Sequence, residues 1–384
     1  RLESFMKWIV NPSFAFFNSD KTGYIFNIPN NKITECTVEF IEFIRDLHKI
    51  EFTYEDFCLK IGCEKEEGKK VFKKLCDESV LISYKYKIDK FQNTMFNVKF
   101  IELASFLTMG YKEKIVFLGF PYDQSVTNRA GCKFASKGLR EISRIIYDRE
   151  YSLLSYNEDI SDISDFIYDI GDIKGIIFDR NGPEFSFLTN IIFSLVCTSN
   201  FPIVLGGDHS ISFSTINGAS LKGEIGVIHI DAHDDYFEFN LNNWSHEMHH
   251  GNYLGGFANN DAVKKIYCIG IRSLTPYLIS NDKVKIYPRK SIFETFQLDK
   301  NLKYYITFDV DVIDPLLIGG VGTPVPFGFS LDQIRELLIR LIQEFEIVGM
   351  DVVEFIPDKK EEILTICSLI FECVVQQIRR NQND

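Results

Sequence analysis

Residues 225–235 read Ile-Gly-Val-Ile-His-Ile-Asp-Ala-His-Asp-Asp, and this stretch decides the fold. Its first six residues are almost uninterruptedly apolar, which is typical of a strand buried on both faces of a parallel sheet. Directly after them Asp231, His233 and Asp235 alternate, and a period of two sends such side chains to one side. The stretch therefore predicts an α/β fold with a polar site at the carboxyl ends of its strands.

Two further segments follow the same pattern of an apolar run that ends in polar residues. Residues 206–210 read Gly-Gly-Asp-His-Ser, and residues 308–315 read Phe-Asp-Val-Asp-Val-Ile-Asp-Pro. Together the three segments supply two imidazoles and at least four carboxylates, which is enough to hold two divalent metal ions. The candidate metal ligands are His209, Asp231, His233, Asp235, Asp309 and Asp311.

The remaining polar residues of these segments have simpler interpretations. Asp208, Asp234 and Asp314 break the alternation or abut Pro315, so we expect structural roles for them. His229 lies inside the apolar run and is expected to be a hydrogen-bonded core histidine.

The donor set indicates which metal the site would take. Carboxylates combined with imidazoles favour Mn²⁺, and no cysteine lies in the three segments, which argues against a structural zinc site. Four buried carboxylates carry too much charge to remain unpaired, and two divalent cations would balance it. We therefore expect two Mn²⁺ per chain, an arrangement commonly used to activate water for hydrolysis.

From about residue 115 onward, apolar runs of strand length alternate with helical patterns, which predicts a parallel sheet covered on both faces. Ser330 and Gln333 form a capping box that opens the last of these helices. The expected strands are 115–119, 202–205, 225–230, 265–270, 304–308 and 347–353, and the expected helices are 136–147, 185–198 and 331–345.

The first 100 residues have a different pattern. A hairpin over 16–28, three helical patterns near 35–48, 54–62 and 65–77, and a strand over 80–84 predict a small winged-helix-like α+β unit. The lysines of the third helix are interspersed with acidic residues, which favours a solvated face over a DNA-binding one. We expect this domain over 1–100, a linker over 101–113 and the α/β domain over 114–384.

Composition excludes several classes of partner. The 384 residues carry a formal net charge of −12, which argues against nucleic acid, and no apolar run is long enough to cross a membrane. Nine cysteines, an odd number without a Cys-x-x-Cys pair, are expected to be reduced core residues. The first residues lack the pattern of a signal peptide, so we expect a cytoplasmic protein.

Several further segments accompany the three acidic ones, and together they resemble the arginase/agmatinase (ureohydrolase) family over residues 114–380. The resemblance implies a three-layer α/β/α sandwich with a dimanganese centre that hydrolyses a guanidino group and releases urea. The matching segments are 119–123 (Gly-Phe-Pro-Tyr-Asp), 129–134 (Arg-Ala-Gly-Cys-Lys-Phe), 139–141 (Leu-Arg-Glu), 169–172 (Asp-Ile-Gly-Asp), 270–273 (Gly-Ile-Arg-Ser), 322–324 (Gly-Thr-Pro) and 354–357 (Glu-Phe-Ile-Pro).

The resemblance also implies a role for each site residue. Asp231 and Asp309 would bridge the two ions, with His209 and Asp235 completing one coordination sphere and His233 and Asp311 the other. Asp235 would in addition relay a proton to the departing amine.

Two residues outside the ligand set complete the implied site. Glu354 would hold the guanidinium by charge-assisted hydrogen bonds, and His250 matches the family's proton shuttle. His246 and His249 compete with His250 for that role. Family members commonly form trimers or hexamers, so the resemblance implies a homo-oligomer.

The sequence departs from the family in the loop expected to bind the end of the substrate opposite the guanidino group. Arginases that act on free arginine have a short polar loop after the aspartate ligand, whereas residues 236–240 here read Tyr-Phe-Glu-Phe-Asn. Residues 5–86 resemble, more weakly, a winged-helix domain that binds leader peptides in ribosomal peptide maturation, and an oligomerisation or packing extension is the alternative. We therefore expect a peptide arginase that converts arginyl side chains of a precursor peptide, bound through its leader, to ornithine.

Three alternatives remain open. One is a small-molecule ureohydrolase such as an arginase, an agmatinase or a guanidino-acid hydrolase. Another is a formimino-glutamate hydrolase. From a different class, the chain could be an inactive, metal-stabilised binding protein.

Overall fold

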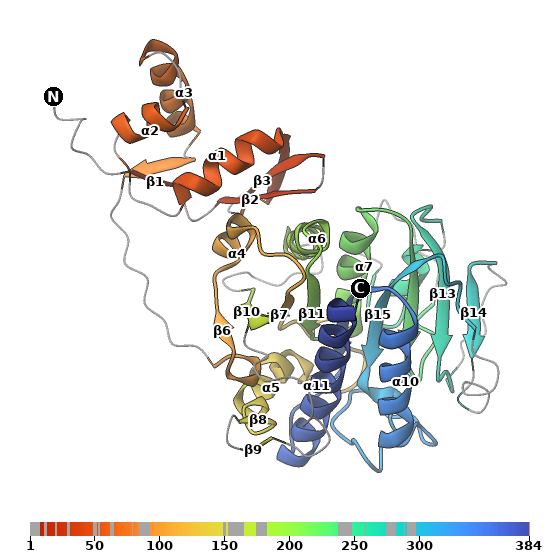
Figure 1. Cartoon of the computed structure of the whole chain (residues 1–384). Coiled ribbons are helices and arrows are strands. Elements are labelled where there is room, and N and C mark those ends of the chain that lie inside the picture. The colour runs from red at the N-terminus through yellow and green to blue at the C-terminus, as the bar shows by residue number, and fades with distance from the viewer. Residues whose placement is uncertain are drawn as a thin grey trace. The chain divides into compact units, whose positions relative to one another are not determined.

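The computed structural model describes residues 8–10, 14–19, 21–28, 31–48, 52, 54–61, 65–78, 80–83, 93–148, 151–152, 165–173, 183–236, 248–257, 259–273, 282–287, 289 and 297–383. The chain divides into two compact units (Figure 1). The first comprises residues 1–92 and 101–112, and the second comprises residues 93–100 and 113–384.

The second unit is built on a nine-stranded sheet in the order β14-β13-β12-β15-β16-β11-β7-β10-β6, and all its strand pairs are parallel. Apolar residues fill the central strands, as expected where a sheet is covered on both faces. The strands are β6 (Lys99–Phe100), β7 (Ile115–Gly119), β10 (Ile167–Asp172), β11 (Phe201–Leu205), β12 (Ile225–Ile230), β13 (Val263–Ile269), β14 (Val284–Tyr287), β15 (Lys303–Asp309) and β16 (Ile347–Val353).

Helices form the layers on either side of this sheet. On one side α11 (Lys360–Asn383) packs between α5 (Ala135–Ser143) and α10 (Leu331–Glu344), and on the other α6 (Pro183–Cys197) packs against α7 (Ser212–Ser220) (Figure 1). The two layers and the parallel sheet confirm the predicted α/β/α sandwich. A short antiparallel pair, β8 (Tyr147–Asp148) and β9 (Tyr151–Ser152), follows α5.

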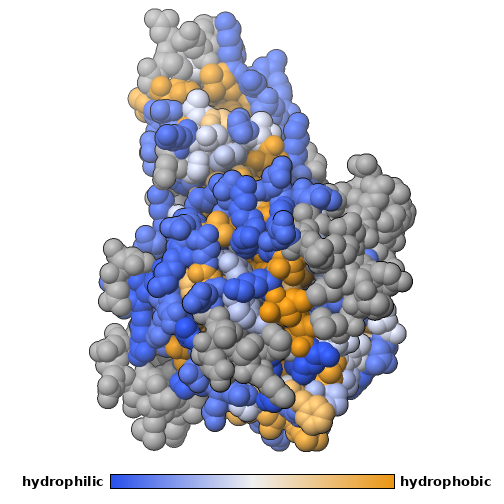
Figure 2. Space-filling view, turned by 90° about the vertical axis from the view of Figure 1, so that its right-hand side faces the viewer, coloured by the Kyte–Doolittle hydropathy of each residue, from blue (hydrophilic) through white to orange (hydrophobic). Residues whose placement is uncertain are grey.

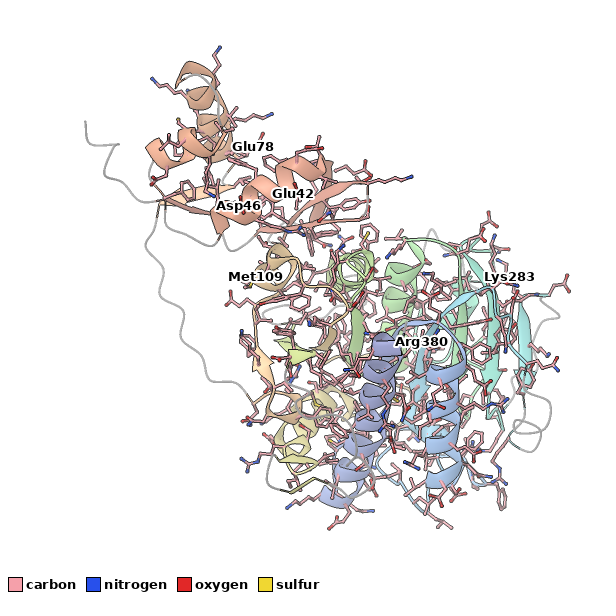
Figure 3. The ribbon with its side chains drawn as sticks, in the orientation of Figure 1. Glu42, Asp46, Glu78, Met109, Lys283 and Arg380 are labelled. Carbon is pink, nitrogen blue, oxygen red and sulfur yellow. The ribbon has the colours of Figure 1, made fainter. Side chains whose placement is uncertain are left out.

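The ends of helix α10 are held by specific contacts. The predicted capping box is present, since the Ser330 side chain accepts from the Gln333 backbone and the Gln333 side chain accepts from the Ser330 backbone. At the other end of α10, Arg380 of α11 (labelled in Figure 3) donates to the backbone oxygens of Ile342 and Phe345. A cation at a helix carboxyl end is favoured by the helix dipole, so Arg380 helps to join α10 and α11.

The first unit contains a three-stranded antiparallel sheet and a two-stranded one. Thr108 of α4 accepts a hydrogen bond from the Phe16 backbone and, through its own carbonyl, one from Arg45. The elements of the unit are β1 (Trp8–Val10), β2 (Phe14–Asn18), β3 (Gly23–Asn27), β4 (Lys32–Cys36), α1 (Val38–His48), α2 (Tyr54–Ile61), α3 (Lys65–Asp77), β5 (Leu81–Ser83) and α4 (Leu103–Met109).

Two predictions about this region need correction. Residues 101–113, expected as a linker, contain helix α4, and residues 101–112 group with the first unit because α4 packs on β2 and α1. The helical pattern near 35–48 begins only at Val38, since residues 32–36 form a third strand beside β3. That the unit reads a leader peptide stays a prediction.

The described cysteines and one face of the surface have the following features. The described cysteines form no disulfide with one another, and five of them are buried. On the face drawn in Figure 2, hydrophilic residues cover most of the coloured surface and hydrophobic ones form smaller patches. Within the described part of the chain, no helix has the length and apolarity needed to cross a membrane.

Candidate metal centre

Four neighbouring strands bring the candidate residues together. In the sheet, β12, β15, β16 and β11 lie side by side, and the segments with Asp231, Asp309, Glu354 and His209 follow their carboxyl ends. Because the strands are parallel, these ends meet at one edge, where ligands bind in open α/β sheets. Residues far apart in the sequence thus form one cluster.

The first half of the cluster surrounds one nitrogen of His209. Its Nδ1 lies 3.0 Å from Asp231 Oδ2, 3.1 Å from Asp235 Oδ2 and 3.1 Å from Asp309 Oδ2. A single ring proton cannot serve three carboxylate oxygens, and both His209 Nδ1 and Asp231 Oδ2 are buried without a hydrogen-bond partner. Four donor atoms that converge in this way fit a divalent cation.

The second half of the cluster surrounds His233. Its Nδ1 lies 2.9 Å from Asp311 Oδ2 and 3.4 Å from Asp231 Oδ1. Asp231 therefore turns one oxygen toward each half, although its Oδ1 also accepts a hydrogen bond from the His233 backbone at 2.6 Å, so its bridging role stays a prediction as well. Asp309 faces His209 with Oδ2, while its Oδ1 accepts a hydrogen bond from the Asp311 backbone at 2.7 Å, so its own bridging role stays a prediction.

Three of the carboxylates, Asp235, Asp309 and Asp311, carry unfavourable charge in the absence of a cation, whereas, despite burial, the neighbouring histidines lower the pKa of Asp231. Burial, reinforced by neighbouring carboxylates, raises the pKa of Asp309 well above its ordinary value and that of Asp235 to about 7. Burial opposes the charge on His233 as well, but hydrogen bonds to Asp231 and Asp311 raise its pKa to about 12. The site is thus built for more positive charge than its own side chains provide, which divalent ions would supply.

Glu354 and His250 stand beside the cluster and touch each other. His250 Nδ1 lies 3.1 Å from Glu354 Oε1, which also accepts a hydrogen bond from the His209 backbone at 2.9 Å. Glu354 is buried and has a φ of 62°, an uncommon conformation for a residue other than glycine. Such an outlier is consistent with a functional side chain held in place by its surroundings.

The side chains at this edge line a cavity of about 200 Å³. Among the described residues the lining comprises Thr127, His233, Asp234, Asp235, His249, His250, Gly251, Ser273, Asp309, Thr323 and Glu354. The predicted site residues Asp235, His250 and Glu354 therefore share one opening, which also exposes part of the candidate metal centre.

Of the three aspartates expected to be structural, Asp208 and Asp314 have structural contacts, whereas Asp234 lines the cavity. Asp208 accepts hydrogen bonds from the backbones of Ser210 and Ser125, and Asp314 accepts from the backbone of Gly328. His229 is fully buried and hydrogen-bonded at both ring nitrogens, as predicted for a core histidine.

Two of the sequence predictions concern residues near the cavity. His246 and residues 237–240 lie outside the described residues, so the expected aromatic loop is described only at Tyr236. His249 reaches the cavity, yet its Nδ1 accepts from the Gly251 backbone, whereas His250 contacts Glu354. Of the two shuttle candidates that lie within the described residues, His250 is thus better placed than His249.

Sequence reasoning missed the residues that hold the predicted ones. The Thr127 backbone donates to His250 Nε2 at 3.1 Å, and Ser125 accepts from the His250 backbone at 3.0 Å. Tyr253 and Thr307 contact His209 Nε2. No local pattern marks these residues, although Thr127 lies between two of the segments that carried the family resemblance.

Comparison with known proteins agrees with this geometry. The chain is 30% identical over 268 residues to an agmatinase of Neisseria gonorrhoeae, covering 65% of this chain and 81% of the relative. It is 31% identical over 261 residues to a mitochondrial arginase of Medicago truncatula, covering 63% and 74%. The crystal structure of the agmatine ureohydrolase of Thermoplasma volcanium superposes with a TM-score of 0.60 at 25% identity, covering 71% of this chain and 92% of that one.

A model of the arginase family matches residues 113–375, which include every predicted ligand, Glu354 and His250. The N-terminal residues up to 112 lie outside the match. The predicted resemblance is confirmed: the chain belongs to the arginase family and is a hydrolase of guanidino C–N bonds.

Proposed function

We propose that this ureohydrolase uses two Mn²⁺ ions to hydrolyse the guanidino group of arginyl side chains in a peptide, releasing urea and leaving ornithine. The observation that carries the chemistry is the convergence of His209 Nδ1 with three carboxylate oxygens at 3.0–3.1 Å. His209, Asp231, Asp235 and Asp309 would hold one ion, and His233 and Asp311 would complete the site of the other. When bound, such a pair of ions activates water at neutral pH.

The surrounding side chains position the guanidinium. Glu354 presents a buried carboxylate to the cavity, and a carboxylate facing the planar fork of a guanidinium forms charge-assisted hydrogen bonds. Asp235 lies in the same cavity, where its carboxylate would pass a proton to the departing amine.

The contacts of His250 define the tautomer of its neutral ring. The Thr127 backbone N–H donates to Nε2, so the neutral ring carries its proton on Nδ1 and donates it to Glu354. Burial opposes a charge on this ring, but Glu354 raises the pKa of His250 above its ordinary value. A histidine with a neutral and an accessible charged form can move a proton between the cavity and solvent, as a shuttle to the departing amine requires.

Two observations support a side chain rather than a free amino acid as substrate. The described lining of the cavity contains no lysine or arginine to pair with a free α-carboxylate. The volume of about 200 Å³ is also below the roughly 300–1,000 Å³ of sites that enclose a whole ligand, which suits the end of an arginyl side chain whose backbone stays outside. The N-terminal unit, absent from the family match, would hold the rest of the peptide.

A small-molecule ureohydrolase is the second candidate. The specific observation in its favour is the 30% identity to an agmatinase over 268 residues. A ligand like agmatine has no carboxylate, so it would need no lysine or arginine in the cavity lining either.

Urea release from the Mn²⁺-loaded full-length protein distinguishes these candidates. The substrates are agmatine, free arginine, and a peptide with a central arginine and blocked ends, compared by kcat/KM. The proposal expects the peptide to be hydrolysed best and free arginine least. Efficient hydrolysis of agmatine with none of the peptide would replace the proposal with the small-molecule alternative.

A further inference from the structure

A chain of buried hydrogen bonds starts behind His209, on the side away from the carboxylates. His209 Nε2 lies 2.9 Å from the Tyr253 hydroxyl, which in turn lies 2.9 Å from His229 Nδ1. His229 Nε2 then lies 3.0 Å from the backbone oxygen of His233. His209, His229 and Tyr253 are all fully buried, and the two imidazoles stack with ring centroids 5.2 Å apart.

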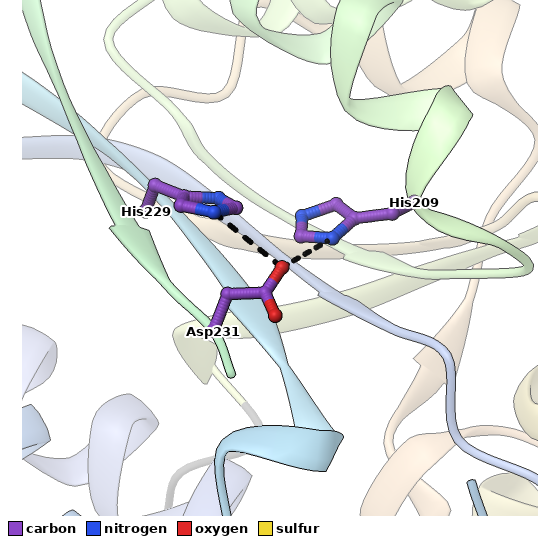
Figure 4. A group of neighbouring side chains, drawn as sticks. All are labelled: His209, His229 and Asp231. Atoms are coloured by element: carbon purple, nitrogen blue, oxygen red, sulfur yellow. Dashed lines mark ion pairs between the residues drawn. The ribbon is translucent and has the colours of Figure 1, made fainter. Parts of the chain in front are cut away.

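His229 also lies near the metal ligands, and one of its ring nitrogens lies within 4.8 Å of ligand atoms of His209 and Asp231, close enough for the three to hold an ion. Figure 4 shows His209 and His229 on either side of Asp231, with His229 Nε2 3.4 Å from Asp231 Oδ2. Both ring nitrogens of His229 are engaged by protein groups, so neither offers a lone pair to an ion. Its role must therefore be exerted through its neighbours.

The far end of the chain defines the direction of every hydrogen bond in it. A backbone carbonyl only accepts, so His229 donates from Nε2 to the His233 oxygen. In the neutral ring Nδ1 is then an acceptor, and the Tyr253 hydroxyl donates to it. The Tyr253 oxygen consequently accepts from His209 Nε2–H, which leaves His209 Nδ1 as the ring nitrogen that faces the three carboxylate oxygens.

We propose that Tyr253 and His229 are positioning residues that fix the tautomer of His209, so that its Nδ1 is presented to the first metal ion. Histidine ligands generally donate their second N–H to an oxygen acceptor that orients the ring. Here the acceptor is a tyrosine whose own proton is directed by a second histidine. Since that histidine is anchored on the backbone of His233, the same chain links the ligands of the two proposed ions.

Thr307 provides a second contact at the same nitrogen. Its hydroxyl lies 2.8 Å from His209 Nε2 and 3.0 Å from the Ser212 hydroxyl. Loss of Tyr253 would therefore weaken the orientation of His209 without abolishing it. Removal of an orienting partner typically lowers metal affinity roughly 10- to 100-fold, and with Thr307 present we expect the lower end of that range.

Tyr253→Phe tests the proposal by calorimetric Mn²⁺ titration of the metal-free full-length protein, with Tyr304→Phe as the matched control. Tyr304 is also a buried tyrosine whose hydroxyl donates one hydrogen bond, but to the Asp299 backbone at 2.7 Å. Tyr253→Phe is expected to bind one Mn²⁺ about tenfold more weakly, with the other ion and the control unchanged. His229→Leu removes the acceptor of the Tyr253 hydroxyl and is expected to weaken the binding of the same ion, whereas His229→Asn, whose amide oxygen lies near the Nδ1 position, is expected to recover part of the affinity.

The proton positions supply a readout that a purely structural role would not give. In ¹⁵N-histidine-labelled, metal-free protein, His229 is expected to be neutral with its proton on Nε2, and its Nδ1 resonance should shift in Tyr253→Phe. A proton on Nδ1 of His229, or equal Mn²⁺ affinities of Tyr253→Phe and the wild type, would overturn the proposal. The proposal rests on the metal centre of the proposed function: a wild type that binds no Mn²⁺ would overturn both, whereas a wild type that binds Mn²⁺ and a His229 with its proton on Nδ1 would overturn the positioning role alone.

Discussion

Glu354→Gln is the substitution that best separates binding of the guanidinium from binding of the metals. The amide matches the carboxylate in shape and keeps one oxygen to accept from the His209 backbone at 2.9 Å and from His250 Nδ1 at 3.1 Å. What it loses is the negative charge of a side chain that is only 2% exposed. The metal ligands themselves are unchanged, so the fold and the metal content are expected to persist.

The expected magnitude follows from the contact that is lost. A hydrogen bond to a charged group contributes about 1.5–3 kcal/mol, and about 1.4 kcal/mol corresponds to a factor of ten. Glu354→Gln should therefore lower kcat/KM for the guanidino substrate by roughly 10- to 150-fold.

The assay is urea release at a fixed Mn²⁺ concentration, with metal content measured on the same samples. Glu354→Asp serves as the control, because it keeps the charge but moves it away from His209 and His250. If Glu354→Gln turns over like the wild type with its metals in place, then Glu354 does not hold the guanidinium. If it loses its metals, the substitution has acted on the centre instead.

Three further predictions concern the metal centre and the fold. Asp309→Ala should lose at least one Mn²⁺ by metal analysis, and an unchanged metal load would remove Asp309 from the site. The raised pKa values of Asp235 (about 7) and His233 (about 12) mean that the metal-free folded protein binds more protons than the unfolded chain, so its melting temperature should fall from pH 6 to pH 8, and a flat profile would contradict this. Arg140→Met removes the guanidinium that donates two hydrogen bonds to the buried Asp169 carboxylate. It should lower the free energy of unfolding in denaturant titrations by about 3–5 kcal/mol, whereas a change below about 1 kcal/mol would show that the ion pair is dispensable.

The strands that sequence analysis predicted best are the uninterrupted apolar runs. Ile115–Gly119, Ile225–Ile230 and Ile347–Val353 begin and end where the pattern predicts, because residues buried on both faces are mostly apolar, and the single polar residues His229 and Asp351 lie inside the strands and not at their ends. Strand β10 was missed because Asp169 and Asp172 interrupt its pattern. Both carboxylates can be tolerated in a buried strand because each forms an ion pair with Arg140. Arg140 lies about thirty positions earlier, so a short stretch of sequence around β10 does not reveal these ion pairs.

The metal ligands were recognisable for a related reason. Alternation after a strand is a local pattern, so the sequence alone singles out Asp231, His233 and Asp235. It does not single out Thr127, because the contact of Thr127 with His250 spans 123 positions and depends on how two loops meet. Tyr253 was missed because its hydroxyl acts through a histidine that looked like ordinary core.

Urea release during stepwise Mn²⁺ loading tests the central claim most directly. Metal-free protein is given increasing equivalents of Mn²⁺, and urea is measured with the blocked arginyl peptide and with agmatine at each step. The account predicts that urea formation rises with bound Mn²⁺ and saturates at two ions per chain. Two tightly bound ions without urea from either compound would contradict it.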